Sequence, residues 1–129
     1  MVKIQINKID TNALLDSGCA TSVITEKLAT YIQATIDYVN PENCETPISA
    51  NGSCMKVIGH TCLDVNIEGL IIPFNFSILK QITQPIILSV DFLEYTNAEI
   101  KWSKHTISFY EMVELPILEQ TRVRMWYCL

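Results

Sequence analysis

Short stretches in which every second residue is apolar recur along this chain and limit the folds open to it. Val2, Ile4 and Ile6 alternate with polar residues, and the same two-residue period returns at 63–68 and 72–78. Side chains of a β-strand point alternately to opposite faces, so each stretch predicts a strand with one buried face. Glycine, proline and asparagine separate the stretches. The pattern predicts an all-β domain that forms a small closed or nearly closed barrel.

Two brief segments have the features of helices, and one has those of a tight hairpin. Thr25 is predicted to cap one or two helical turns at 26–32, and Ser89 to cap a second short helix with Asp91 in its first turn. Asn51-Gly52 lies between strand-like flanks and predicts a hairpin turn, because Asn-Gly readily adopts positive φ.

The most unusual stretch is Leu14-Leu15-Asp16-Ser17-Gly18. Residues 13–16 lack the alternation, which is typical of a strand buried on both faces. A carboxylate at the end of such a strand is costly unless it has partners, and a hydroxyl and turn N–H groups beside it could hold it for acid/base chemistry. Asp-Ser-Gly is also an ordinary turn sequence. The triplet alone leaves both interpretations open.

Length and charge narrow the class of protein further. A chain of 129 residues with 49% apolar residues is expected to form one domain around a single core. The net charge is −5 and no Lys/Arg run is present, so we expect no nucleic-acid partner and favour peptides or small ligands.

Cysteine spacing and hydropathy indicate the surroundings of the protein. The five cysteines show no paired spacing, which predicts neither a disulfide framework nor a zinc site and favours a reducing compartment. No apolar run approaches the roughly 20 residues that span a bilayer, so we expect a soluble intracellular protein with no membrane partner.

Other reactive side chains have simpler explanations than catalysis. Cys19 is interpreted as a small buried residue, although its place beside the Asp16 loop leaves a redox-sensitive thiol open. His60 and His105 are single and are interpreted as surface or structural residues. A cysteine hydrolase using Cys19 is the weakest alternative, because nothing in the sequence brings a histidine to it. Asp91 is explained by stabilisation of a helix first turn.

Four motifs in order resemble the retropepsins, the aspartic proteases of retroviruses and gypsy-type long-terminal-repeat retrotransposons. They are Leu-Leu-Asp-Ser-Gly-Cys-Ala-Thr-Ser-Val-Ile at 14–24, Ala-Asn-Gly at 50–52, Val-Ile-Gly at 57–59 and Pro-Ile-Ile-Leu-Ser-Val-Asp-Phe-Leu at 85–93. The resemblance covers about residues 2–110. We therefore expect a protease domain at 1–110, with 111–129 as a tail that adds a strand, docks on a partner or forms a linker.

The resemblance implies a role for each motif. It makes Asp16 the catalytic aspartate, with Ser17 and Gly18 completing its loop, and makes the hairpin at 50–52 a flap over the substrate. We expect apolar subsites in which five residues contact the peptide: Ala50, Asn51, Gly52, Ile87 and Leu88.

Aspartic-protease chemistry needs two carboxylates that share a proton, one acting as base on a water and the other as acid. The chain holds a single Asp-Ser/Thr-Gly triplet. The second carboxylate must then come from another copy, which predicts a two-fold homodimer that needs no metal or cofactor. The expected activity is endopeptidase cleavage of a polypeptide, as in polyprotein processing, in the cytoplasm or inside a virus-like particle.

One position departs from the family pattern. Retropepsins usually carry a glycine after the second apolar run, and this chain has Ser89 there. The alternative function is therefore a catalytically weak or inactive domain that serves as a dimeric peptide-binding or assembly module.

Overall fold

The computed structural model describes residues 1–39, 48–50, 53–80, 82 and 84–118, with the backbone alone described at 48–50 and 53–55. Most of these residues lie in strands: β1 (Val2–Ile6), β2 (Ile9–Leu15), β3 (Val23–Thr25), β4 (Asp37–Tyr38), β5 (Ile48–Ala50), β6 (Ser53–Met55), β7 (Val57–Ile67), β8 (Leu70–Leu79), β9 (Ile86–Leu88), β10 (Glu99–Lys101), β11 (Thr106–Phe109) and β12 (Val113–Pro116). The helical segments are short: α1 (Glu26–Tyr31), α2 (Val90–Tyr95) and the 3-10 turn η2 (Trp102–Lys104).

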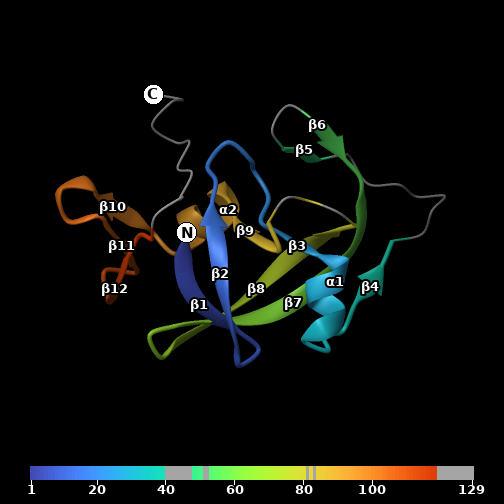
Figure 1. Ribbon diagram of the computed structural model, residues 1–129, viewed down its shortest axis with the longest axis horizontal. Helices are drawn as coiled ribbons and strands as arrows, with labels where there is room; N and C mark the ends of the chain where they lie inside the picture. The colour runs from blue at the N-terminus through green and yellow to red at the C-terminus, as the bar shows by residue number, and fades with distance from the viewer. Residues whose placement is uncertain (40–47, 51–52, 81, 83, 119–129) are drawn as a thin grey trace.

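Six strands close into the barrel expected from the sequence. Their order is β1-β2-β9-β3-β8-β7, and β7 pairs back onto β1 through Gln5↔Asn66 and Ile6↔Val65. The long β7 and β8 curve beneath the other strands, and β4 lies along the outer edge of β7 (Figure 1). The fold is therefore mostly β with two short helices, as predicted.

The alternating stretches form the barrel wall because one face of each is apolar. In β1, Val2, Ile4 and Ile6 are buried, and in β7 buried residues alternate with more exposed ones along the whole strand. Two-residue turns at Asn7-Lys8 and Glu68-Gly69 join neighbouring strands, and all four turn residues have positive φ. Such turns match the twist of paired antiparallel strands.

Aromatic side chains connect the barrel to the C-terminal half of the chain. Phe74 of β8 meets Phe92 of α2 edge to face at 5.1 Å, and Phe92 meets Phe109 of β11 at 6.1 Å. Phe76, Phe92 and Phe109 are fully buried. Edge-to-face pairs at these distances are favourable beyond their burial, so α2 and β11 share one core with the barrel.

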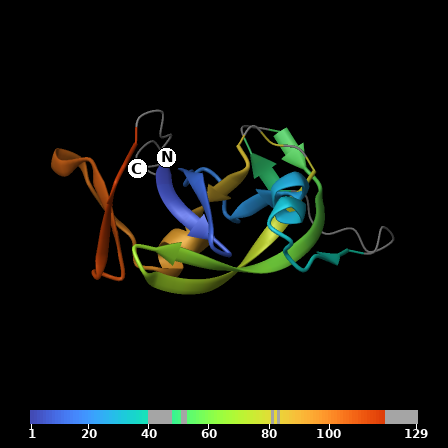
Figure 2. The same cartoon turned by 60° about the horizontal axis from the view of Figure 1, so that its bottom comes forward.

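A second, three-stranded sheet of order β10-β11-β12 stands beside the barrel (Figure 2). Leu115 of β12 is buried in the main core, so residues 113–116 add a strand, one of the three alternatives for the tail. Alternation of Ile100 with Trp102, and of Ile107 with Phe109, predicts a last pair of strands with a turn at 103–105. The strands and the turn are present, but Trp102 begins the turn η2 instead of ending a strand, and His105 after it is in the left-handed region (φ 53°).

The two predicted helices are present, and their caps differ. Thr25 caps α1 as expected, with its hydroxyl accepting a hydrogen bond from the Leu28 N–H at 3.2 Å. α2 begins at Val90, directly after Ser89 in the chain, and the Ser89 hydroxyl makes no capping hydrogen bond. None of the helices in the described part of the chain is long and apolar enough to cross a membrane.

Candidate active site

Asp16 lies where β2 leaves the barrel wall. β2 runs parallel to β9 with Leu15 opposite Leu88, and the Asp16 N–H donates to the Leu88 carbonyl at 3.0 Å. Only 3% of Asp16 is exposed, and its Oδ1 accepts the Gly18 N–H at 2.8 Å. This contact is the side-chain turn that Asp favours two residues before a backbone N–H, and it orients a buried carboxylate at the start of the loop.

The loop that follows is attached to the start of α2. The Val90 N–H donates to the Cys19 carbonyl and the Asp91 N–H to the Ala20 carbonyl, each at 3.2 Å. The first N–H groups of a helix have no partner within it, so carbonyls of the Asp16 loop cap α2.

Asp91 also contacts the loop through its side chain. Its Oδ1 accepts the Ser22 N–H at 2.9 Å, the Ser22 hydroxyl at 2.6 Å and the Phe92 N–H at 2.7 Å. The Ser22 hydroxyl in turn accepts the Ser89 N–H at 2.9 Å. Asp91 is in the first turn as predicted, but two of its three bonds reach Ser22, 69 residues away. No local sequence signal pointed to Ser22.

Ser89 differs from its prediction as a cap. Its backbone is extended (φ −107°, ψ −168°) and its side chain is fully buried. Its Oγ has no hydrogen-bond partner within the described residues, and the same is true of Ser17 Oγ. The capping prediction was wrong because backbone carbonyls and the Asp91 carboxylate fill the positions around the helix start.

Cys19 and the two histidines lie apart in the fold. Cys19 is buried and its thiol donates to the Thr21 carbonyl at 3.4 Å. His60 is on β7, opposite Asp37 of β4, and His105 is exposed at the turn before β11. The structure gives the thiol a backbone partner in place of a histidine base.

The predicted substrate-binding residues come from two places. Ile87 and Leu88 lie on β9, where Leu88 is fully buried in the main core and Ile87 packs in a smaller apolar cluster with residues such as Leu14 and Val57. Ala50 ends β5, which pairs with β6 as a hairpin, whereas Asn51 and Gly52 lie outside the described residues. The hairpin and the Asp16 loop project from the same side of the barrel (Figure 1). A contact of these residues with substrate stays a prediction.

Comparison with known proteins agrees with this geometry. The family model of the PEG10/RTL1 protease domain matches residues 12–113, which include the Asp16 loop, the hairpin and α2. The retroviral protease-like domain of Ddi1 from Leishmania major is similar with a TM-score of 0.73 and 18% identity, over 92% of this chain and 93% of that one. The EIAV protease complexed with the inhibitor HBY-793 is similar with a TM-score of 0.60 and 22% identity, over 77% of this chain and 88% of that one. A search among curated proteins found no match. The resemblance inferred from the motifs is confirmed, as is the retroviral-protease fold.

Proposed function

The chain belongs to the family of PEG10/RTL1 protease domains, and from this premise we propose that it is an aspartic endopeptidase whose catalytic pair is Asp16 from each of two copies. The observation that carries the proposal is Asp16 itself. A carboxylate that is 3% exposed and oriented by the Gly18 N–H stands at the start of a loop on the hairpin side of the barrel. Burying a carboxylate is costly, so a functional role is the simplest reason to keep it there.

The proposed reaction divides acid and base work between the two carboxylates. The ionised Asp16 removes a proton from a water, which attacks the scissile carbonyl carbon, while the protonated Asp16 donates its proton to the carbonyl oxygen. Two carboxylates in close contact cannot both ionise readily, so the pair shares one proton. The resulting diol collapses when a proton reaches the leaving amine, and the peptide bond breaks.

The number of Asp-Ser/Thr-Gly triplets in the sequence supports a site built from two copies of the chain. The sequence has one Asp-Ser/Thr-Gly triplet, and in this proposal the second carboxylate comes from an identical chain across a two-fold axis. Ser17, beside Asp16, has a hydroxyl that is buried without a partner in the part of the chain that the structure describes. In the proposed dimer this loop lies at the two-fold axis, next to the same loop of the second chain.

The substrate in this proposal is a polypeptide. The EIAV protease is complexed with the inhibitor HBY-793, and we place the substrate of this chain between the Asp16 loop and the hairpin at 50–52. Ile87 and Leu88, the other two predicted contact residues, lie on β9, which pairs with the end of β2 beside Asp16. The proposed process is the cleavage of a polyprotein in the cytoplasm or in a virus-like particle. The protease domain spans 1–110, and 111–129 is its extension. The proposed reaction uses no metal or cofactor and involves no nucleic acid or membrane.

One observation favours the alternative of a weak or inactive peptide-binding module. Ser89 follows Leu88, which accepts the Asp16 N–H, and it carries a buried hydroxyl without a partner where the family usually has glycine. A poorly accommodated side chain so close to Asp16 would lower turnover and leave peptide binding intact.

Digestion of a peptide library at mildly acidic pH tests both functions. We expect wild-type protein to cleave and Asp16→Asn to lose cleavage with its fold intact, because the amide has the shape of the carboxyl group but cannot act as base. Asp10 is an exposed aspartate of the same strand, and its Oδ1 accepts a hydrogen bond from the Gln5 amide at 2.9 Å, so Asp10→Asn is the matched control and should keep full activity. Cleavage by pure Asp16→Asn protein at the wild-type rate would overturn the aspartic mechanism, and peptide binding by a wild type that does not cleave would establish the alternative.

A further inference from the structure

Asp91 and Ser22 are more than parts of the α2 start. We infer that Asp91, acting through the Ser22 hydroxyl and the Leu88-Ser89 peptide group, is a positioning residue for Asp16, an inference that rests on the proposed function. The chain of contacts runs from one carboxylate to the other through hydrogen bonds of 2.6, 2.9 and 3.0 Å.

The middle of this chain is one planar group. The Leu88 carbonyl accepts the Asp16 N–H at 3.0 Å, and the Ser89 N–H donates to Ser22 Oγ at 2.9 Å. That carbonyl and that N–H belong to the same peptide unit, which is rigid because its C–N bond has partial double-bond character. Any tilt of the unit at Ser22 must therefore be passed on to the Asp16 backbone.

Asp91 holds Ser22 at one end of this chain of hydrogen bonds, which we call the relay: Asp91, Ser22, the Leu88-Ser89 peptide group and Asp16. Ser22 is fully buried, and both its N–H and its hydroxyl donate to Asp91 Oδ1. Removal of the carboxylate would leave two buried donors without their partner, and such groups move toward other acceptors or water because leaving them unpaired is costly. The Ser22 hydroxyl would then turn away from the Ser89 N–H.

Stabilisation of the helix alone does not explain this arrangement. A first-turn role needs only the Phe92 N–H, which Asp91 Oδ1 accepts at 2.7 Å. Thr96 at the other end of α2 makes a comparable buried contact, with its hydroxyl donating to the Phe92 carbonyl at 2.8 Å. Thr96 has no hydrogen bond to the Asp16 loop among the described contacts, so it offers a control that is matched in burial and helix but not in position.

All three hydrogen bonds to Asp91 end on one oxygen. The effect of these bonds can therefore be separated from the effect of the negative charge by a substitution that keeps an oxygen acceptor. The amide oxygen of Asn can accept the same three donors. We expect Asp91→Asn to keep kcat within about threefold of wild type and Asp91→Ala to lower kcat about a hundredfold with KM changed less than about threefold, since a small displacement of a catalytic group has effects of that size. Ser22→Ala should lower kcat about tenfold, and the Ser22→Ala/Asp91→Ala double variant should lose no more than Asp91→Ala alone, because the two act in one relay. Thr96→Val should leave kcat unchanged.

Amide hydrogen exchange measures how firmly the relay holds the backbone at Asp16 and Ser89, and it does not require enzymatic activity. Asp91→Ala should speed exchange at the Asp16 and Ser89 amides at least about tenfold more than at β7 amides, whereas Asp91→Asn and Thr96→Val should not. Equal acceleration at all these amides, or an unchanged kcat in Asp91→Ala with the wild type active, would overturn the positioning role while the protease function stood. A wild type without cleavage would overturn the protease function, and exchange at Asp16 and Ser89 would still decide whether Asp91 holds the loop.

Discussion

Three serine hydroxyls around the Asp16 loop are all shielded from solvent, but they are not equally satisfied. Ser22 Oγ both donates to Asp91 and accepts from the Ser89 N–H. Ser17 Oγ and Ser89 Oγ have no partner in the described part of the chain. A satisfied buried hydroxyl contributes to stability, whereas an unpaired one costs about 1–3 kcal/mol. Neighbouring serines should therefore respond to truncation with opposite signs.

Ser89→Ala should raise the free energy of unfolding by about 1 kcal/mol, because the change removes a desolvated hydroxyl and leaves the backbone as it is. Ser89 has extended dihedrals that alanine adopts without strain, so glycine is not required here for its conformation. Urea unfolding of purified protein measures the effect.

Ser22→Ala is the matched control, and it should lower the free energy of unfolding because two hydrogen bonds end on that hydroxyl. A Ser89→Ala protein that is less stable than wild type by a similar amount would mean that the Ser89 hydroxyl has a partner that this structure does not show.

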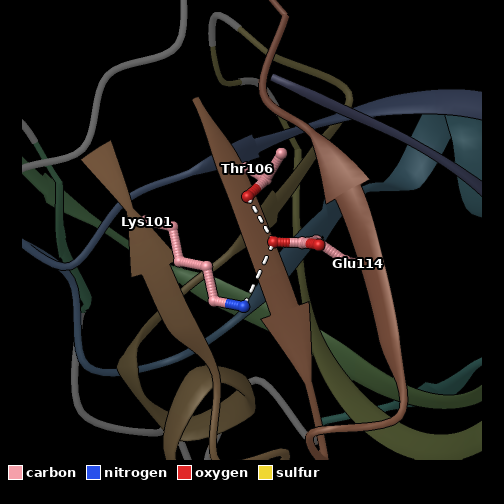
Figure 3. A network of polar contacts seen from close by, with 3 residues as sticks. All are labelled: Lys101, Thr106 and Glu114. Atoms are coloured by element: carbon pink, nitrogen blue, oxygen red, sulfur yellow. Dashed lines mark hydrogen bonds and ion pairs between the residues drawn. The ribbon is translucent and has the colours of Figure 1, made fainter. Parts of the chain in front are cut away.

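At the scale of secondary-structure elements, the three-stranded sheet carries a polar network on its outer face. Glu114 of β12 accepts the Thr106 hydroxyl of β11 at 2.6 Å and pairs with Lys101 of β10 at 3.3 Å, so one carboxylate joins three strands (Figure 3). The Thr106 hydrogen bond, and after it the bond from Lys101, lowers the pKa of Glu114. Both partners favour the ionised carboxylate.

A lowered pKa fixes the sign of the pH dependence. The network stabilises the fold above the ordinary Glu pKa, and this contribution is lost as the pH falls through the lowered value. We expect Thr106→Val and Lys101→Met each to raise the pKa of Glu114, because each change removes a hydrogen bond that favours the ionised carboxylate. Titration of the Glu114 carboxyl carbon by NMR gives both values. An unchanged Glu114 pKa in either variant would contradict the role of that bond.

Much of the fold could be predicted from the sequence because its signals are local. Alternation identified β1, β7 and β8, and the turns at Asn7-Lys8 and Glu68-Gly69 contain asparagine and glycine, two of the residue types that separate the alternating stretches. Trp102 was placed in a strand because the alternation runs on through it, but the chain enters a 3-10 turn there. The turn was expected at 103–105 and begins one residue earlier, because the Trp102 carbonyl closes it by accepting the His105 N–H at 3.2 Å.

The contacts around the candidate site could be predicted only in part. Asp16 and its loop were recognisable from the triplet, whereas Ser22 acquires its role from a residue 69 positions away. Gly59 is a similar case: a Cβ there would lie 2.9 Å from the Asp37 carbonyl oxygen, because β4 crosses close to β7. Nothing beside Gly59 in the sequence indicates that β4 will pass there, so such tertiary constraints have no local signal.

At the scale of the whole molecule, the barrel closes on itself and presents one Asp-Ser-Gly loop. β7 pairs with β1, so the six barrel strands form a continuous wall. The second sheet follows α2 in the chain, and after it the Leu118 N–H donates to the Met1 carbonyl at 2.7 Å. A closed barrel of this size has no internal repeat that could supply a second Asp-Ser-Gly loop. The proposed chemistry therefore makes assembly a requirement for activity.

The dependence of activity on assembly gives the last prediction. Below the dissociation constant of the dimer, the cleavage rate should approach the square of the chain concentration, because the concentration of active sites follows that of the dimer. Above the dissociation constant, Asp16→Asn chains give a second test: a ninefold excess over wild type should lower activity about tenfold, since random pairing puts most wild-type chains into dimers with one carboxylate. Asp10→Asn chains in the same excess should not inhibit. A monomeric mass by sedimentation, with a rate strictly proportional to wild-type concentration and insensitive to Asp16→Asn, would show that one chain completes the site alone and would contradict the two-copy mechanism.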